Sequence, residues 1–135
     1  MSTQGPFPDS AISGRRILIL DDELLIAADT KALVTRLGGI VLGPYARVRA
    51  ALEAIQTHPV DGAVLDINVA GVQSFVVAEA LEARRVPFVF CTGYGRDSVL
   101  PRFQHAPVVE KPLIPELFIA ALADALKAGK ARAES

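Results

Sequence analysis

Polar residues follow four apolar runs of the chain, and their types suit phosphoryl chemistry. Carboxylates that crowd together repel one another unless a cation lies between them, and a small cluster of hard oxygen ligands favours Mg²⁺. A hydroxyl and an ammonium beside such a cluster could share the charge of an incoming phosphoryl group. Together these groups could support the transfer of a phosphoryl group to a carboxylate. They are Asp21, Asp22 and Glu23 after residues 15–20, Asp66 in residues 62–67, Thr92 and Gly93 after residues 87–91, and Lys111 and Pro112 after residues 107–110.

The elements that must position these groups alternate between apolar runs and amphipathic segments. The runs are short and nearly continuous, as in strands that are buried on both faces. The segments between them carry apolar stripes at helical spacing, such as Ile26, Leu33 and Leu37. This pattern predicts an α/β fold, a doubly wound five-stranded parallel sheet with helices on both faces. The predicted strands are 15–20, 40–44, 62–67, 87–91 and 107–110, and the predicted helices are 22–39, 48–58, 74–85, 115–128 and a poor one, interrupted by Pro101, at 96–104.

The predicted fold brings the polar residues to one edge of the sheet. In open α/β sheets, ligands bind beyond the carboxyl ends of the strands, near the point where the strand order reverses. Each residue alone has an ordinary explanation. Asp21 and Asp22 could cap the next helix, Asp66 and Thr92 could be turn residues, and Lys111 could be solvated. Their occurrence together at four strand ends favours a common site.

Length and composition indicate one globular domain. The chain has 135 residues, of which 51% are hydrophobic and 21% charged, and its formal net charge is −1. This balance gives no reason to expect a nucleic-acid or membrane partner. Without a membrane-spanning run or a signal-peptide pattern, and with Cys91 expected to be a buried, reduced thiol, we expect a cytoplasmic protein. We expect the domain to span 15–128, with a disordered tail at 1–14 and a flexible tail at 129–135.

The chain resembles the receiver domains of bacterial two-component response regulators. The resemblance covers the chain apart from its two tails, and it implies a flavodoxin-like, CheY-like fold. It also implies that Asp66 accepts a phosphoryl group from a sensor histidine kinase or a histidine phosphotransfer protein. The motifs that carry the resemblance are ILILDDE (17–23), VLDIN (64–68) with Gly71 five residues after the aspartate, FCTG (90–93) and VEKP (109–112).

The resemblance implies a Mg²⁺ site around the acceptor. Asp22 would bind the metal directly, Asp21 partly through water, and Asp66 and the backbone carbonyl of Asn68 would complete the protein ligands. Two other classes of protein remain alternatives. A phosphatase of the haloacid dehalogenase type needs a second aspartate two residues after the first as general acid, and Asn68 occupies that position. A receiver-like docking module that is never phosphorylated would not need the full set of polar residues.

The resemblance also implies which groups contact the phosphoryl group. The hydroxyl of Thr92 would move towards it, and Lys111 would pair with one of its oxygens. The backbone N–H groups of Ile67 and Gly93 would help to offset its charge. The Lys111–Pro112 peptide bond is expected to be cis.

Residues 87–94, PFVFCTGY, resemble the P-F-x-F-A-T-G-Y signature of the FAT GUY single-domain regulators, with Cys91 in place of alanine. This implies a stand-alone receiver linked to kinases of the HWE/HisKA2 group. It would signal through protein–protein contacts, with a homodimer possible, or act as a phosphate sink. The chain departs from most receivers at Ala70, where proline is usual, and at Val108, where an aromatic switch residue is usual. We expect Tyr94, which would also flank the path of water, to take over part of the switch.

Overall fold

The centre of the computed structural model, which describes residues 11–93, 95 and 98–134, is a five-stranded parallel sheet. Its strand order is β2-β1-β3-β6-β7, so the order reverses between β1 and β3. This arrangement confirms the predicted α/β fold. The strands are β1 (Arg16–Leu20), β2 (Ile40–Tyr45), β3 (Gly62–Leu65), β6 (Phe88–Thr92) and β7 (Val108–Glu110).

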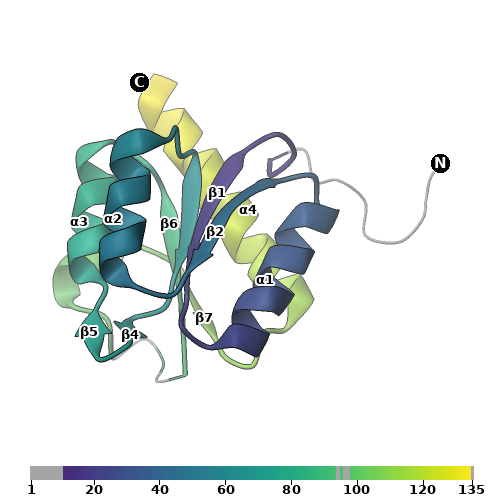
Figure 1. Ribbon diagram of the computed structural model, residues 1–135. Helices are drawn as coiled ribbons and strands as arrows, with labels where there is room; N and C mark the ends of the chain where they lie inside the picture. The colour runs from purple at the N-terminus through teal and green to yellow at the C-terminus, as the bar shows by residue number, and fades with distance from the viewer. Residues whose placement is uncertain (1–10, 94, 96–97, 135) are drawn as a thin grey trace.

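Helices cover both faces of the sheet, so the central strands are buried on both sides (Figure 1). All residues of β3 and β6 are buried, which explains their continuous apolar sequences. None of the helices in the described part of the chain has the length and apolar character needed to cross a membrane. The helices are α2 (Val48–Thr57) and α3 (Phe75–Ala83) on one face, and α1 (Leu24–Arg36) and α4 (Pro115–Glu134) on the other.

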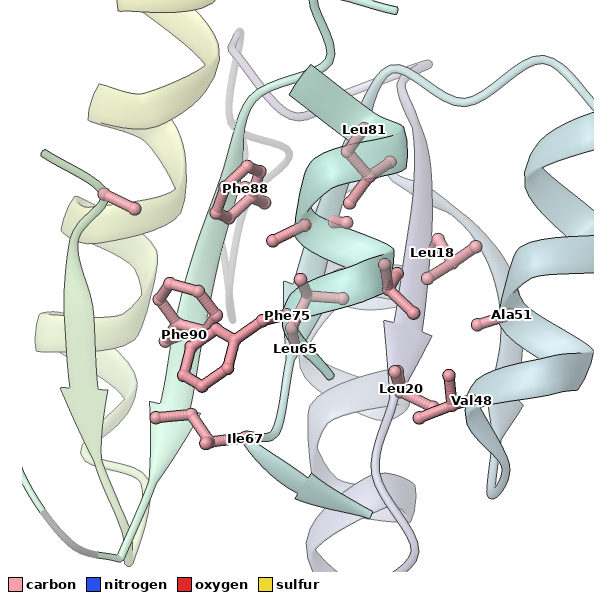
Figure 2. Close-up of a cluster of buried hydrophobic side chains, with 14 of the residues drawn as sticks. Leu18, Leu20, Val48, Ala51, Leu65, Ile67, Phe75, Leu81, Phe88 and Phe90 are labelled. Atoms are coloured by element: carbon pink, nitrogen blue, oxygen red, sulfur yellow. The ribbon is translucent and has the colours of Figure 1, made fainter. Parts of the chain in front are cut away.

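Aromatic side chains fill the core between β6 and α3 (Figure 2). The ring of Phe75 lies edge-on to Phe90 at 5.9 Å and stacks on Phe103 at 5.6 Å between centroids. Phe88 lies edge-on to Phe90 at 5.4 Å. Such pairs add to the stabilisation from burial of the rings. They anchor α3 and the segment around Phe103 to β6, the strand that ends at Thr92.

The loop after β3 contains a short hairpin that the sequence pattern did not predict. Its strands are β4 (Asn68–Val69) and β5 (Val72–Gln73), which pair antiparallel. The two residues between them both have positive φ, 51° at Ala70 and 82° at Gly71. This is the conformation that two-residue hairpin turns require. Glycine adopts this conformation readily but alanine seldom does, so only Gly71 indicated a hairpin turn.

Three other boundaries differ from those predicted. The supposed tail at 1–14 is too long, because Ile12 is fully buried and its carbonyl accepts the N–H of Arg15 at 3.0 Å. Strand β2 runs through Gly43 and Pro44 to Tyr45, which an edge strand permits. The backbone of α4 continues to Glu134, so the predicted helix end at residue 128 was too early.

The prediction of a helix at 96–104 is wrong for residues 98–104, the part of this range that the structure describes. The 3₁₀ turn η2 (Pro101–Phe103) stands there, with the ring of Phe103 buried in the core. Proline at the first position of this turn is favourable, but it disrupts a longer helix.

Candidate functional site

Lys111 lies at the centre of the polar groups that end the strands. Its Nζ is 3.0 Å from Oδ2 of Asp21, 3.1 Å from Oδ2 of Asp66 and 2.5 Å from Oε1 of Glu23. The Lys111 side chain is only 8% exposed, so its ion pairs with the buried carboxylates of Asp21 and Asp66 are shielded from water, whereas Glu23 is exposed. Side chains that follow β1, β3 and β7 therefore meet at one edge of the sheet.

Three carboxylates form an acidic cluster beside this ammonium. Asp21, Asp22 and Asp66 each offer one oxygen, and these oxygens lie within 4.8 Å of one another. The cluster carries more negative charge than Lys111 offsets, and hard carboxylate oxygens at this spacing fit a divalent cation. The residues present therefore fit a bound metal ion.

Backbone N–H groups orient each carboxylate of the cluster. Oδ1 of Asp21 accepts the N–H of Glu23 at 2.9 Å, at the start of α1. Oδ2 of Asp22 accepts the N–H of Ala70 at 2.9 Å, which ties the β4–β5 hairpin to the site. Oδ1 of Asp66 accepts the N–H of Ile67 at 2.8 Å. In each case one oxygen is held by the backbone, which fixes the direction of the other.

Burial and the neighbouring charges shift the protonation of the two central groups. Burial raises the pKa of Asp66 to about 6, although the ammonium of Lys111 opposes the shift, and the charge of Asp21 adds to it. For Lys111, burial lowers the pKa, but its bonds with Glu23 and Asp21 outweigh that effect and hold the pKa above its usual range. Lys111 is therefore a permanent cation at neutral pH.

The remaining expected site residues line or support an open cavity at the same edge. Asn68, Gly93 and Asp66 are among the residues that line this cavity of about 610 Å³. Thr92 is fully buried at the end of β6, and its carbonyl accepts the N–H of Lys111 at 2.9 Å. The Lys111–Pro112 peptide bond is cis.

Two residues of the expected switch lie apart from the cavity or outside the structure. Val108 is half-buried, pairs in register with Phe90 on β6 and packs against the aromatic core. Tyr94 lies outside the described residues. The proposed transfer of the switch to Tyr94 stays a prediction.

The single cysteine has the environment that the sequence indicated. Cys91 is 1% exposed within β6, and burial raises the pKa of its thiol to about 12. The thiolate is the reactive form of cysteine, so this side chain is a packing residue in the fold.

Sequence reasoning missed two residues that support the site. Ser74 is fully buried, and its Oγ donates a hydrogen bond to the carbonyl of Asp66 at 2.5 Å. Its N–H donates to the carbonyl of Ile67 at 2.8 Å. A serine just before a helix is usually interpreted as a cap, which concealed this role. Glu23 was noted among the strand-end acids, but its position beside Asp22 gave no sign that it would pair with Lys111.

Replacement of Ser74 by alanine should destabilise the fold by about 1–3 kcal/mol, because a buried carbonyl loses its side-chain partner. Urea unfolding of the variant and of wild type measures the difference. An alanine variant as stable as wild type would show that the hydrogen bond contributes nothing.

The chain is similar to two solved structures over most of its length. The solution structure of SdrG from Sphingomonas melonis Fr1 is 41% identical with a TM-score of 0.76, and the match covers 88% of this chain and 99% of SdrG. The PhyR stress response regulator is 33% identical with a TM-score of 0.72, over 83% of this chain and 45% of PhyR. The chain belongs to the CheY-like receiver domains of response regulators.

A more distant structure shares the fold. It is the response regulator receiver domain protein (CheY-like) from Methanospirillum hungatei JF-1, which is 24% identical with a TM-score of 0.76 over 87% of this chain and 98% of its own. No protein-family model and no curated protein matches the chain.

Proposed function

We propose that this receiver accepts a phosphoryl group on Asp66 from a phosphohistidine of a sensor histidine kinase or a histidine phosphotransfer protein. The observation that carries the proposal is the position of the Lys111 ammonium, 3.1 Å from Oδ2 of Asp66 and beside the acidic cluster. A carboxylate oxygen of Asp66 would attack phosphorus, the P–N bond would break, and the imidazole would leave with the bonding electrons. The product is an acyl phosphate on Asp66.

The residues around Asp66 supply the charge that this transfer needs. Lys111 would exchange part of its contact with Asp66 for a phosphoryl oxygen, while Glu23 and Asp21 keep it charged and in place. The N–H of Ile67 now bonds to Asp66 itself and would be shared with the phosphoryl group. The N–H of Gly93 and the hydroxyl of Thr92 complete the proposed set of donors.

The acidic cluster would hold Mg²⁺. Asp22 and Asp66 would bind the ion directly and Asp21 partly through water, with the carbonyl of Asn68 as a further ligand. When bound, Mg²⁺ supplies positive charge that offsets the charge of the phosphoryl oxygens. Asp22 would keep its bond to the N–H of Ala70 through one oxygen and use the other for the ion.

A relative supports phosphorylation. SdrG from Pseudomonas melonis Fr1, 40% identical with a TM-score of 0.71 over 82% of this chain and 95% of its own, has been solved in a BeF3-activated conformation. Beryllofluoride resembles a phosphoryl group in shape and charge. A similar chain therefore takes up such a group, and we extend this property to Asp66.

The surface beside the site suits a protein donor. Leu24 and Leu25 follow Glu23 at the start of α1 and are 81% and 83% exposed. Ile114 and Leu117 are exposed at the start of α4. Exposed apolar groups around a polar cavity are typical of a docking surface. Because residues 87–94 resemble the FAT GUY signature, we propose a kinase of the HWE/HisKA2 group as the donor.

Magnesium should stabilise the protein against heat. Binding to the folded state alone raises its stability by about 2.7 kcal/mol at a ligand concentration one hundred times the dissociation constant. Asp22→Asn should lose most of this increase, whereas Asp29→Asn, at an exposed position of α1, should retain it. Melting temperatures with Mg²⁺ and with a chelator measure the effect. An equal increase in both variants would contradict binding at the acidic cluster.

Phosphorylation itself is tested with a small phosphodonor such as phosphoramidate. Wild type and Asp29→Asn should gain the mass of one phosphoryl group in intact-mass spectra with Mg²⁺, and Asp66→Asn should gain none. An unmodified wild type would instead favour a receiver-like docking module.

A further inference from the structure

Two adjoining cavities lie at the end of the sheet opposite to Asp66. Their lining residues come from around the amino ends of β6 and β7 and from the C-terminal half of α4. The larger has a volume of about 620 Å³ and the smaller about 250 Å³. Both are lined by Arg85, Val86, Pro87 and Gly129, so a single ligand could occupy the two together.

The larger cavity is mainly apolar. Its volume and lining are those of cavities that enclose small organic ligands. Two acids line it: Glu82 is paired with Arg102 at 3.4 Å and with His105 at 3.0 Å, and Asp124 is exposed on α4. The remaining lining is largely apolar and includes Val86, Phe88, Ala106, Pro107, Ala125 and Ala128.

The smaller cavity is basic. Arg15, Arg84, Arg85 and Lys130 line it, and none of them forms an ion pair within the described part of the chain. The acid in its lining, Asp61, accepts the backbone N–H of Arg16 at 2.8 Å and offsets only part of the charge. In a chain with a net charge of −1, this local excess of positive charge favours an anion.

Arg85 lies where the two cavities meet, and its backbone is in an unfavourable conformation. Its φ of +58° is in the left-handed region just after α3, where glycine or asparagine is usual. A residue with a Cβ atom is destabilised there by about 1–2 kcal/mol. Arg85 lines both the apolar and the basic cavity, so this position offers a cation to a ligand that spans them.

We propose that the two cavities bind a small amphipathic anion. Its apolar body would occupy the larger cavity, and a carboxylate or phosphate head would pair with Arg85 and the neighbouring cations. Guanidinium groups bind both kinds of head through paired hydrogen bonds. This site is separate from Asp66, and its existence does not depend on the proposed phosphorylation.

The 135-residue chain is titrated with four probes while backbone amide shifts are followed by NMR. The probes are decanoate, monodecyl phosphate, decan-1-ol and inorganic phosphate, each kept below the concentration at which it aggregates. We expect saturable shifts around Phe88 and Ala125 with at least one of the two decyl anions, and affinity at least tenfold lower for the alcohol and for inorganic phosphate. The comparison of decanoate with decyl phosphate identifies the preferred head.

Substitutions separate this site from general binding of an apolar probe. Arg85→Gly should weaken anion binding at least tenfold while leaving the melting temperature unchanged or higher, because glycine relieves the left-handed backbone. Lys130→Ala should also weaken it, and Arg49→Ala, at an exposed position of α2, should not. The proposal is overturned if wild type shows no saturable shift with either anion, if the alcohol binds as tightly, or if Arg85→Gly retains full affinity.

Discussion

Asp66→Asn should stabilise the fold above neutral pH and have little effect in acid. Burial raises the pKa of Asp66 from 3.8 to about 6. Between these two pH values Asp66 is therefore protonated in the folded state and deprotonated in the unfolded state. The stability that this proton provides is complete below about pH 4 and is lost as the pH rises through 6. A shift of this size corresponds to about 3 kcal/mol. The advantage of the asparagine variant should grow by that amount over the same range.

Urea unfolding at a series of pH values, with a chelator present, measures this advantage. Asp29→Asn is the matched control, because its carboxylate is exposed on α1. A constant difference between Asp66→Asn and wild type from pH 4 to pH 8 would contradict the raised pKa.

Lys111→Met should destabilise the protein by about 3–5 kcal/mol at pH 8 in the absence of divalent cations. The substitution keeps the length of the side chain but removes the charge that pairs with Asp21 and Asp66, whose side chains are nearly buried. Removing one partner of a buried ion pair leaves the other charge uncompensated. The loss should be smaller at pH 5, where Asp66 takes up a proton.

A double substitution isolates the coupling between the two groups. Combining Lys111→Met with Asp66→Asn should recover part of the lost stability, because one uncompensated carboxylate is then absent. Measured unfolding free energies of the four proteins form a complete cycle. Strictly additive effects would show that Lys111 and Asp66 do not interact as their 3.1 Å separation indicates.

The convergence of the site could be predicted because it depends on topology. Once the apolar runs were assigned to parallel strands, Asp21, Asp66 and Lys111 had to lie at the same edge, whatever the details of their loops. The pairing of Glu23 with Lys111 could not be predicted in this way, since it depends on the direction of two side chains. The bond from Ser74 to Asp66 likewise joins residues whose contact is made only by the loop between them.

The parts of the fold that the sequence did not predict are those that depend on tertiary contacts. Ala11 and Ile12 are a short apolar pair before β1, and the packing of α1 and α4 on the same face makes them part of the core. Ala70 adopts a left-handed backbone that its residue type does not indicate, and its N–H bonds to Asp22. Phe103 has the apolar character of a helix face, but it is held by ring contacts with Phe75 and Phe90 instead.

The central claim is that Asp66 forms an acyl phosphate. Treating the protein with phosphoramidate and Mg²⁺, then with borohydride, reduces an acyl phosphate on aspartate to homoserine, which peptide mass spectrometry locates in the sequence. The account predicts homoserine at position 66 in wild type, and none anywhere in Asp66→Asn. Homoserine at Asp21 or Asp22, or at no position in wild type, would contradict it.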